Sequence, residues 1–203
     1  MTSLGRRLLP GNPILAGMRL LFLLILTALA CADPPRGWKF DTTSPQGYVS
    51  STDRTIFHSG GSSGFLQSVG SVSRRTNAVL MQSVTAAPYR GRRLRLSGYV
   101  QTRAVGGWAG LFLRVDPREG PALEFDNMQD RPIQGTTAWT RYALELNVPP
   151  EGDQVHFGVL LAGAGEVWLD DVALETIEAP PPGSAERRRV RGPGHPLNLG
   201  FEE

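Results

Sequence analysis

Short segments in which apolar residues alternate with polar or aromatic ones run through the middle of the chain and constrain its fold. Leu94, Leu96 and Val100 show this period of two, and it recurs at about nine or ten places with turn residues every 8–12 positions or so. No segment sustains the 3.6-residue apolar period of a helix. The pattern predicts an all-β domain over residues 37–176, a two-sheet β-sandwich of the jelly-roll kind.

The positive charge of the chain lies mostly outside this domain. Residues 1–30 carry three arginines and no acid, so without them 18 Lys and Arg stand against 19 Asp and Glu, and the net charge changes from +2 to −1. Leaving out the end of the chain from residue 184 as well gives 14 against 16, a net charge of −2. A near-neutral domain lacks the basic surface that nucleic acid requires, so we expect no nucleic-acid partner.

Residues 1–30 have the pattern of an export signal. Arg19 precedes an apolar run, Leu20 to Ala30, which is too short to span a bilayer comfortably and is followed by no stop-transfer charges. Met18 directly precedes Arg19, so translation from Met18 is a second interpretation. Either start predicts a protein exported by a bacterium, with residues 31–36 as a short linker before the domain.

Cys31, the single cysteine, ends the apolar run and has two interpretations. In the first, it is the lipid-modified first residue of a lipoprotein, since thioether lipidation needs a thiol at that position. In the second, Ala28-Leu29-Ala30 is a small-x-small site at which ordinary signal peptidase releases the chain into the periplasm. The chain reaches a membrane only through the lipid anchor of the first interpretation. A single cysteine excludes an internal disulfide, so stability must come from the core.

The C-terminal part of the chain changes in composition. Residues 177–196 form a linker rich in proline and arginine, which includes three consecutive prolines at 180–182. Residues 197–203 then have the pattern of a strand. Three interpretations of this tail are open: the remnant of a further module, a strand that docks on this or another copy, or a disordered segment.

The segment 125–142 is unusually polar for a stretch between two predicted strands. It contains two Asp, two Gln, one Asn and two Arg, with aromatic residues near both ends. A loop of this length that is tied down at its ends is commonly functional. We therefore expect its side chains to contribute to a ligand site.

The predicted ligand site combines this loop with the outward faces of two strands. Sugar binding needs flat aromatic rings that stack on the apolar ring face, and polar groups that pair with hydroxyls. If the strands that carry Trp108 and Trp139 are neighbours, they form an aromatic floor with polar walls. The alternative is that both tryptophans are packed inside and that Arg114 pairs with Glu145 or Asp126. The predicted contact residues are Trp108, Arg114, Asn127, Gln129, Asp130, Arg131, Trp139 and Arg141.

Catalytic motifs are weak. The run from Gly60 to Gly64 formally matches Gly-x-Ser-x-Gly, but a nucleophile elbow needs a strand before it and a helix after it, whereas a strand follows here. Glycosidase chemistry needs two carboxylates that flank the scissile bond, and no pair among the acids is singled out by its context. We therefore expect a protein that is not an enzyme, with a hydrolase as the least favoured function.

Three motifs resemble those of a known class. The turn His58-Ser59-Gly60-x-Ser62-Ser63, the run Trp139-x-Arg141-Tyr142 and the closing segment from Val167 to Leu174, which contains Asp-Asp-Val, are similar to galactose-binding-like jelly rolls such as cellulase-associated carbohydrate-binding modules. The resemblance covers about residues 37–176. The run 125–132 is also similar to one in bacterial exported proteins of unassigned activity.

The resemblance implies a non-catalytic ligand-binding module of the bacterial cell envelope, with carbohydrate as the leading ligand class. The alternative is a structural or protein-interaction domain of an envelope assembly. Related modules often hold a structural Ca²⁺, which implies Asp41, Asp170 and Asp171 as candidate ligands among the six to eight oxygens that Ca²⁺ requires. The alternative is that these aspartates hydrogen-bond neighbouring loops. No other cofactor is expected.

Overall fold

The computed structural model describes residues 33–177 and 195–203. The predicted export signal, Cys31 and most of the predicted linker lie outside the described residues. The described residues form strands and one 3₁₀ turn, and contain no helix long and apolar enough to cross a membrane. The elements are β1 (Lys39–Thr42), β2 (Tyr48–Asp53), β3 (Ser63–Ser68), β4 (Asn77–Thr85), η1 (Ala87–Tyr89), β5 (Arg93–Asp116), β6 (Glu124–Asp126), β7 (Ile133–Asn147), β8 (Gln154–Ala162) and β9 (Glu166–Thr176).

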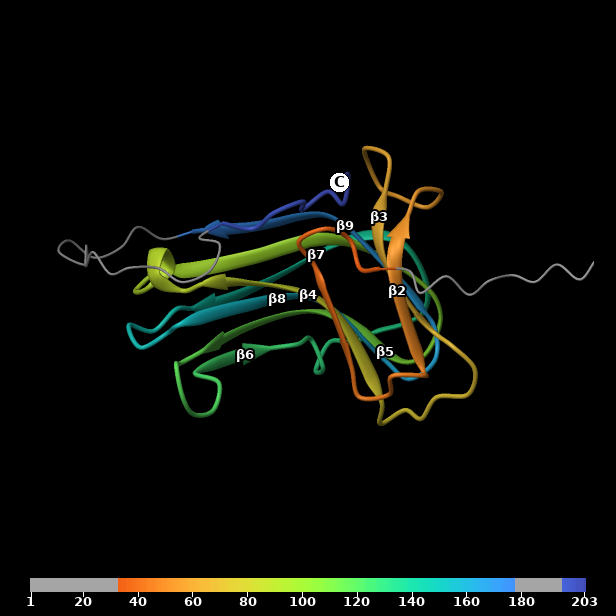
Figure 1. Cartoon of the computed structure of the whole chain (residues 1–203), viewed down its shortest axis with the longest axis horizontal. Coiled ribbons are helices and arrows are strands. Elements are labelled where there is room, and N and C mark those ends of the chain that lie inside the picture. Colours follow the sequence, from red (N-terminus) through yellow and green to blue (C-terminus); the bar gives the residue numbers. More distant parts are fainter. Residues whose placement is uncertain (1–32, 178–194) are drawn as a thin grey trace, which may run out of the picture. The chain divides into compact units, whose positions relative to one another are not determined.

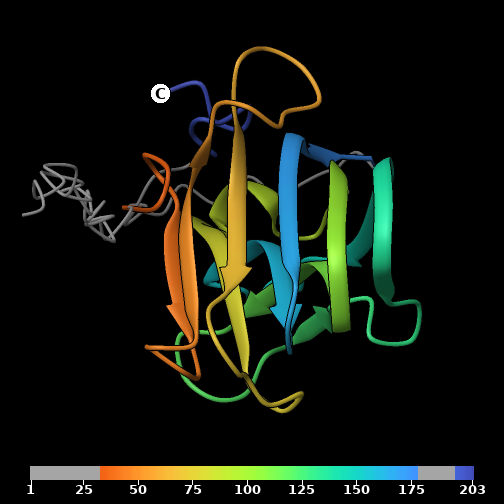
Figure 2. The same cartoon turned by 90° about the vertical axis from the view of Figure 1, so that its right-hand side faces the viewer.

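The strands form two layers, which confirms the predicted β-sandwich. One layer, here called sheet A, has the order β2-β3-β9-β5-β7 and faces the viewer in Figure 2. The other, sheet B, has the order β1-β4-β8-β5-β6, and part of it is labelled in Figure 1. All of these pairings are antiparallel, so each sheet can bury one face and leave the other to solvent.

Strand β5 belongs to both sheets. Residues 94–103 pair with β9 in sheet A, and residues 108–116 pair with β8 in sheet B. The sequence predicts two strands here, with a turn at Gly106-Gly107, and this prediction is wrong. The chain bends without reversing: a Cβ on Gly107 would lie 2.1 Å from the carbonyl oxygen of Ala162, so glycine lets β5 pass close to β8 as it changes sheets.

The inward side chains of the two sheets form one hydrophobic core. The alternation seen in the sequence places apolar residues on the facing sides, where their transfer from water stabilises the fold by roughly 25 cal/mol per Å². Those with no exposed surface include Leu66, Leu94, Leu96 and Leu169 in sheet A, and Leu80, Leu111, Leu113, Phe157 and Leu161 in sheet B.

The segment predicted as one long loop, 125–142, is shorter than expected. Strand β7 begins at Ile133, so residues 127–132 alone connect it to β6. The first part of β7 pairs with β5 through register shifts, and the hydroxyl of Thr102 donates to the carbonyl oxygen of Gly135 at 3.1 Å. Bulged pairing of this kind interrupts the period of two, which is why the sequence pattern does not reveal a strand here.

The tail does not form the predicted strand. Residues 195–203 form a turn that docks on the sandwich, and the side chain of Phe201 has no exposed surface. The ring of Phe201 stacks on that of Trp38, with ring centroids 4.6 Å apart. Of the three interpretations open from the sequence, the structure has the tail docked on the domain.

Candidate functional site

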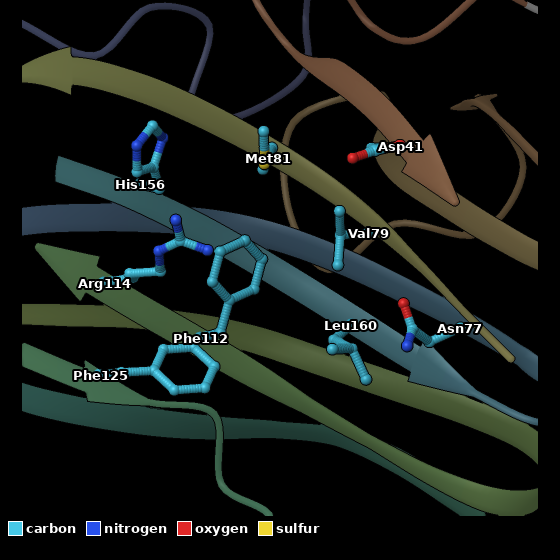
Figure 3. A pocket seen from close by; sticks show the side chains of 9 residues that line it. All are labelled: Asp41, Asn77, Val79, Met81, Phe112, Arg114, Phe125, His156 and Leu160. Atoms are coloured by element: carbon cyan, nitrogen blue, oxygen red, sulfur yellow. The ribbon is translucent and has the colours of Figure 1, made fainter. Parts of the chain in front are cut away.

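A groove with a volume of about 410 Å³ lies on the outer face of sheet B. Figure 3 shows polar residues at its two ends, with Arg114 and His156 at one end and Asp41 and Asn77 at the other. Apolar side chains lie between them. The nine lining residues are Asp41, Asn77, Val79, Met81, Phe112, Arg114, Phe125, His156 and Leu160.

Strand alternation explains which residues line the groove. On β8, His156 and Leu160 line the groove, and Gly158 lies between them on the same face. The register places Gly158 between Phe112 of β5 and Met81 of β4. Because Gly158 has no side chain, the middle of the sheet is low, and its neighbours on either side form the walls.

Two phenylalanines give the groove its flat apolar surface. Phe112 is only 6% exposed and is packed into the face of the sheet, whereas Phe125 on β6 is 53% exposed. Phe125 pairs with Arg114 in the register, so an exposed ring and a guanidinium stand on adjacent strands. This pairing of an aromatic face with planar hydrogen-bonding groups suits a ligand that has apolar ring faces and polar edges.

A hydrogen-bonded array closes the polar end. The Nε and Nη2 atoms of Arg114 donate to the two carboxylate oxygens of Asp116, at 2.6 and 2.5 Å. Nε2 of His156 lies 3.3 Å from Oδ2 of Asp116, and Nδ1 of His156 lies 2.7 Å from the Ser83 hydroxyl. A neutral imidazole with its proton on Nε2 satisfies both contacts, since it donates to the carboxylate and accepts from the hydroxyl.

The ionisation of this array follows from its surroundings. The hydrogen bonds from Arg114 lower the pKa of Asp116, against the opposing effect of burial. Burial lowers the pKa of His156, and this outweighs the attraction of Asp116, while the nearby Arg114 and Lys39 act in the same direction as burial. His156 is therefore neutral in the folded protein at pH values where an unfolded chain has begun to protonate.

We expect this histidine to make the fold less stable in acid. Because the pKa of His156 is lower when folded, the unfolded chain binds the extra proton, and stability falls as the pH drops through about 6.5, with a slope of at most about 1.4 kcal/mol per pH unit. Urea unfolding between pH 7.5 and 5.5 should show a smaller loss for His156→Gln than for the unchanged protein. His195→Gln is the control and should keep the full slope; an equal slope in all three proteins contradicts the assignment.

Of the predicted ligand residues on β5, the structure places one in the groove. Arg114 lines it and pairs with Asp116, not with Glu145 or Asp126 as the alternative had it. Trp108 lies on β5 within sheet B but outside the groove, half-buried near Gly110.

The predicted loop residues are largely bonded to one another. The Arg131 guanidinium donates to Asp126 at 2.6 Å and to Asp130 at 2.7 Å. The side-chain oxygen of Asn127 accepts the backbone N–H of Gln129 at 3.1 Å. These bonds fix the short connection between β6 and β7, and none of the four predicted loop residues lines the groove.

Trp139 and Arg141 belong to sheet A. Arg141 pairs with Tyr99 in the register, and its guanidinium donates to the Ser97 hydroxyl at 2.9 Å. The Trp139 ring stands edge-on to the ring of His58, which stacks on Tyr99 with centroids 3.6 Å apart. The expected single floor does not form, because β7 adjoins the half of β5 in sheet A and Trp108 lies in the other half.

The three predicted calcium ligands do not come together. Asp41 is on β1 in sheet B, where its carboxylate accepts the N–H of Thr42. Asp170 and Asp171 are on β9 in sheet A, and they hold the loop before β3: Asp170 accepts the N–H groups of His58 and Ser59, and Asp171 contacts both of their side chains. Among residues 33–177 and 195–203, no group of three or more His, Cys, Asp or Glu could hold a metal ion.

The groove residues absent from the predicted set carry a weak signal in the sequence. His156 and Leu160 alternate with inward-facing apolar residues, as do Asn77, Val79 and Met81. Their period of two shows that each set shares a face, but such a pattern does not tell which strands are adjacent. The groove is formed by adjacency, so its residues cannot be separated from other outward-facing ones by sequence.

One relative in sequence is known by name. The Bacillus subtilis (strain 168) protein named "Uncharacterized HTH-type transcriptional regulator YbfP" is 38% identical over 172 residues, which cover 83% of this chain and 57% of that protein. The chain thus spans a little over half the length of this relative. No protein-family model matches the chain.

Solved structures with the same architecture share little sequence. The enzymatically active domain of tailspike protein 4 from bacteriophage CBA120 matches 70% of this chain and 20% of its own, at a TM-score of 0.57 and 17% identity. The tandem CBM22-1-CBM22-2 domain of Paenibacillus barcinonensis Xyn10C matches 79% and 49%, at 0.54 and 15%. A family 16 carbohydrate-binding module matches 70% and 92%, at 0.51 and 16%. The described domain therefore has the jelly-roll fold of carbohydrate-binding modules.

Proposed function

We propose that this protein is a non-catalytic module that binds carbohydrate in the groove of sheet B. The observation that carries the proposal is the groove itself, in which the exposed ring of Phe125 adjoins Arg114. Sugars present apolar ring faces edged by hydroxyls, and this surface offers both kinds of partner. The jelly-roll fold supports the proposal, although fold alone does not determine function.

The two serine arrangements in the described chain do not favour hydrolysis. Ser62, from the Gly-x-Ser-x-Gly match, has no exposed surface, and its hydroxyl donates to the carbonyl oxygen of Phe201 at 2.5 Å. Ser83 contacts His156, but the aspartate behind that histidine gives both its oxygens to Arg114. Burial in one case and a competing ion pair in the other support a binding role.

Truncating Phe125 is the direct test of the groove. We expect Phe125→Ala to weaken binding to the best ligand from a glycan array by about tenfold or more, since an exposed aromatic anchor is lost from the contact surface. Isothermal titration calorimetry measures the change. Phe57→Ala removes another exposed phenylalanine, 37% exposed and outside the groove, and should leave the affinity unchanged. Equal affinities for all three proteins, or no glycan ligand at all, contradict the proposal.

A second candidate function is the ligand-sensing part of a larger regulatory protein. The observation that favours it is the relative named as an HTH-type transcriptional regulator, which is considerably longer than the matched region. Both functions require the groove to bind a ligand. They differ in the next step, because a sensor must pass the binding event to a second domain, and a binding module need not.

We also propose that the chain is exported and anchored through lipidation of Cys31, a residue outside the described structure. The apolar run before this single cysteine supports the proposal. Intact-mass analysis of the membrane fraction should show a chain that starts at Cys31 and carries added acyl mass. A soluble chain with an unmodified thiol contradicts it.

A further inference from the structure

The tail 195–203 fills a cleft at one end of the sandwich, away from the groove. Phe201 is completely buried, and its ring is stacked on Trp38 at an interplanar angle of 27°. The other side of the ring lies against Gly64 of β3, where a Cβ would be 2.4 Å from a ring carbon. Trp38 in turn stands edge-on to Phe157 in the core, with centroids 6.1 Å apart. Phe201 is thus an aromatic anchor in a pocket shaped for it.

Side chains of the cleft also bind the backbone of the tail. The amide of buried Gln82 pairs with both backbone groups of Leu197, accepting its N–H at 3.0 Å and donating to its carbonyl oxygen. The indole N–H of Trp38 donates to the carbonyl oxygen of Asn198 at 3.0 Å. Side chains that read main-chain groups beside a single aromatic pocket are typical of a peptide-recognition site.

The end of the tail is held by a carboxylate. Oε1 of Glu202 accepts the N–H of Gly61 at 2.8 Å and that of Ser62 at 3.3 Å. Two adjacent backbone N–H groups directed at one carboxylate oxygen form a small anion-binding turn. Together with the Phe201 pocket, this contact fixes both the position and the direction of the docked segment.

The docked contacts do not depend on which chain supplies the tail. The cleft residues Trp38, Gln82, Gly61 and Ser62 are each more than 100 positions from their tail partners. The tail is separated from Ile177 at the end of the described domain by residues 178–194, a length of chain that can extend to about 60 Å. A segment supplied by a second copy would make the same contacts, so exchange costs mainly the entropy of association.

We propose that this cleft is a docking site for the C-terminal segment of a second copy of the chain, so that two copies exchange tails. The cleft is lined by Trp38, Gly64 and Gln82, none of which lines the groove. Exchange therefore joins two domains and leaves both grooves open. The proposal does not depend on what the groove binds.

A labelled peptide tests whether the cleft accepts a segment in trans. The probe is a fluorescein-labelled peptide of residues 195–203, and the acceptor is the full chain with Phe201→Ala, whose own tail lacks the anchor. We expect a saturable rise in fluorescence anisotropy, and binding at least about tenfold weaker to the unchanged chain, whose own tail competes at high effective concentration. A peptide with Phe201→Ala should not bind. Failure of the original peptide to bind the Phe201→Ala chain at about 1 mM overturns the proposal.

Complementation between two full chains tests the exchange itself. One partner carries Phe201→Ala, with a defective tail and an intact cleft, and the other carries Gly64→Val, with an intact tail and a filled cleft. Light scattering should find a 1:1 complex in the mixture and monomers in each separate sample. Two monomers in the mixture, from two folded partners, overturn the exchange. If Gly64→Val does not fold, a Gly64→Ala chain takes its place, and the peptide measurement decides independently.

Discussion

Replacing Gly158 by alanine is expected to destabilise the domain by about 3–5 kcal/mol, because the new methyl group has nowhere to go. A Cβ at this position would lie 2.0 Å from the carbonyl oxygen of Leu80 and 2.9 Å from the Cα of Met81, both of them backbone atoms of the adjacent strand β4. The residue also has a φ of +157°. Strands β4 and β8 would have to separate, in the middle of sheet B.

Gly70→Ala is the matched control for this change. Gly70 also has a positive φ, +65°, but nothing lies within 4 Å of a Cβ built on it. This substitution should cost about 1 kcal/mol, the penalty for placing alanine in a left-handed conformation. Urea unfolding of both variants separates the steric cost from the conformational one. Similar losses for the two variants would show that β4 yields easily to the methyl group.

Replacing Phe201 by alanine is expected to reduce stability by about 3–4 kcal/mol, the usual cost of removing a fully buried phenylalanine. The change leaves a cavity between Trp38 and Gly64, and it exposes the Trp38 ring on which Phe201 stacks. Tryptophan fluorescence during urea unfolding should therefore report a lower midpoint and an altered native signal.

The same tail provides the control. Leu197 is 57% exposed, and its contacts with Gln82 use backbone atoms, so Leu197→Ala should change stability by less than about 0.5 kcal/mol. If Phe201→Ala is as stable as Leu197→Ala, the tail does not stabilise the domain, and the docked arrangement has no energetic weight.

The fold could be predicted because alternation is a local property. The period of two at Leu94 and Leu96, and its recurrence between turns, requires only neighbouring residues to be read, and it correctly indicates two buried sheet faces. What could not be predicted is where a strand bends. Gly106 and Gly107 are compatible with both a turn and a close crossing, and only the position of Ala162 on β8 decides between them.

The site was less predictable for a related reason. Trp108 and Trp139 each lie on strands that adjoin β5 or belong to it, yet the sheet change within β5 places them in different layers. Phe125 and His156 join Arg114 through strand pairings that bring together residues as much as 42 positions apart. The tail is a similar case, because the Trp38 pocket is the reason that Phe201 is buried, and nothing near Phe201 in sequence indicates that pocket.

The passage of β5 through both sheets has a consequence for how the domain opens. Its first half is hydrogen-bonded to β7 and β9 and its second half to β6 and β8, so neither sheet can detach without breaking pairs on this strand. The two layers should therefore melt in one transition. Backbone amides in the middle of β5 should exchange with deuterium only when the whole domain unfolds, whereas those of β1, at an edge, should exchange through local fraying.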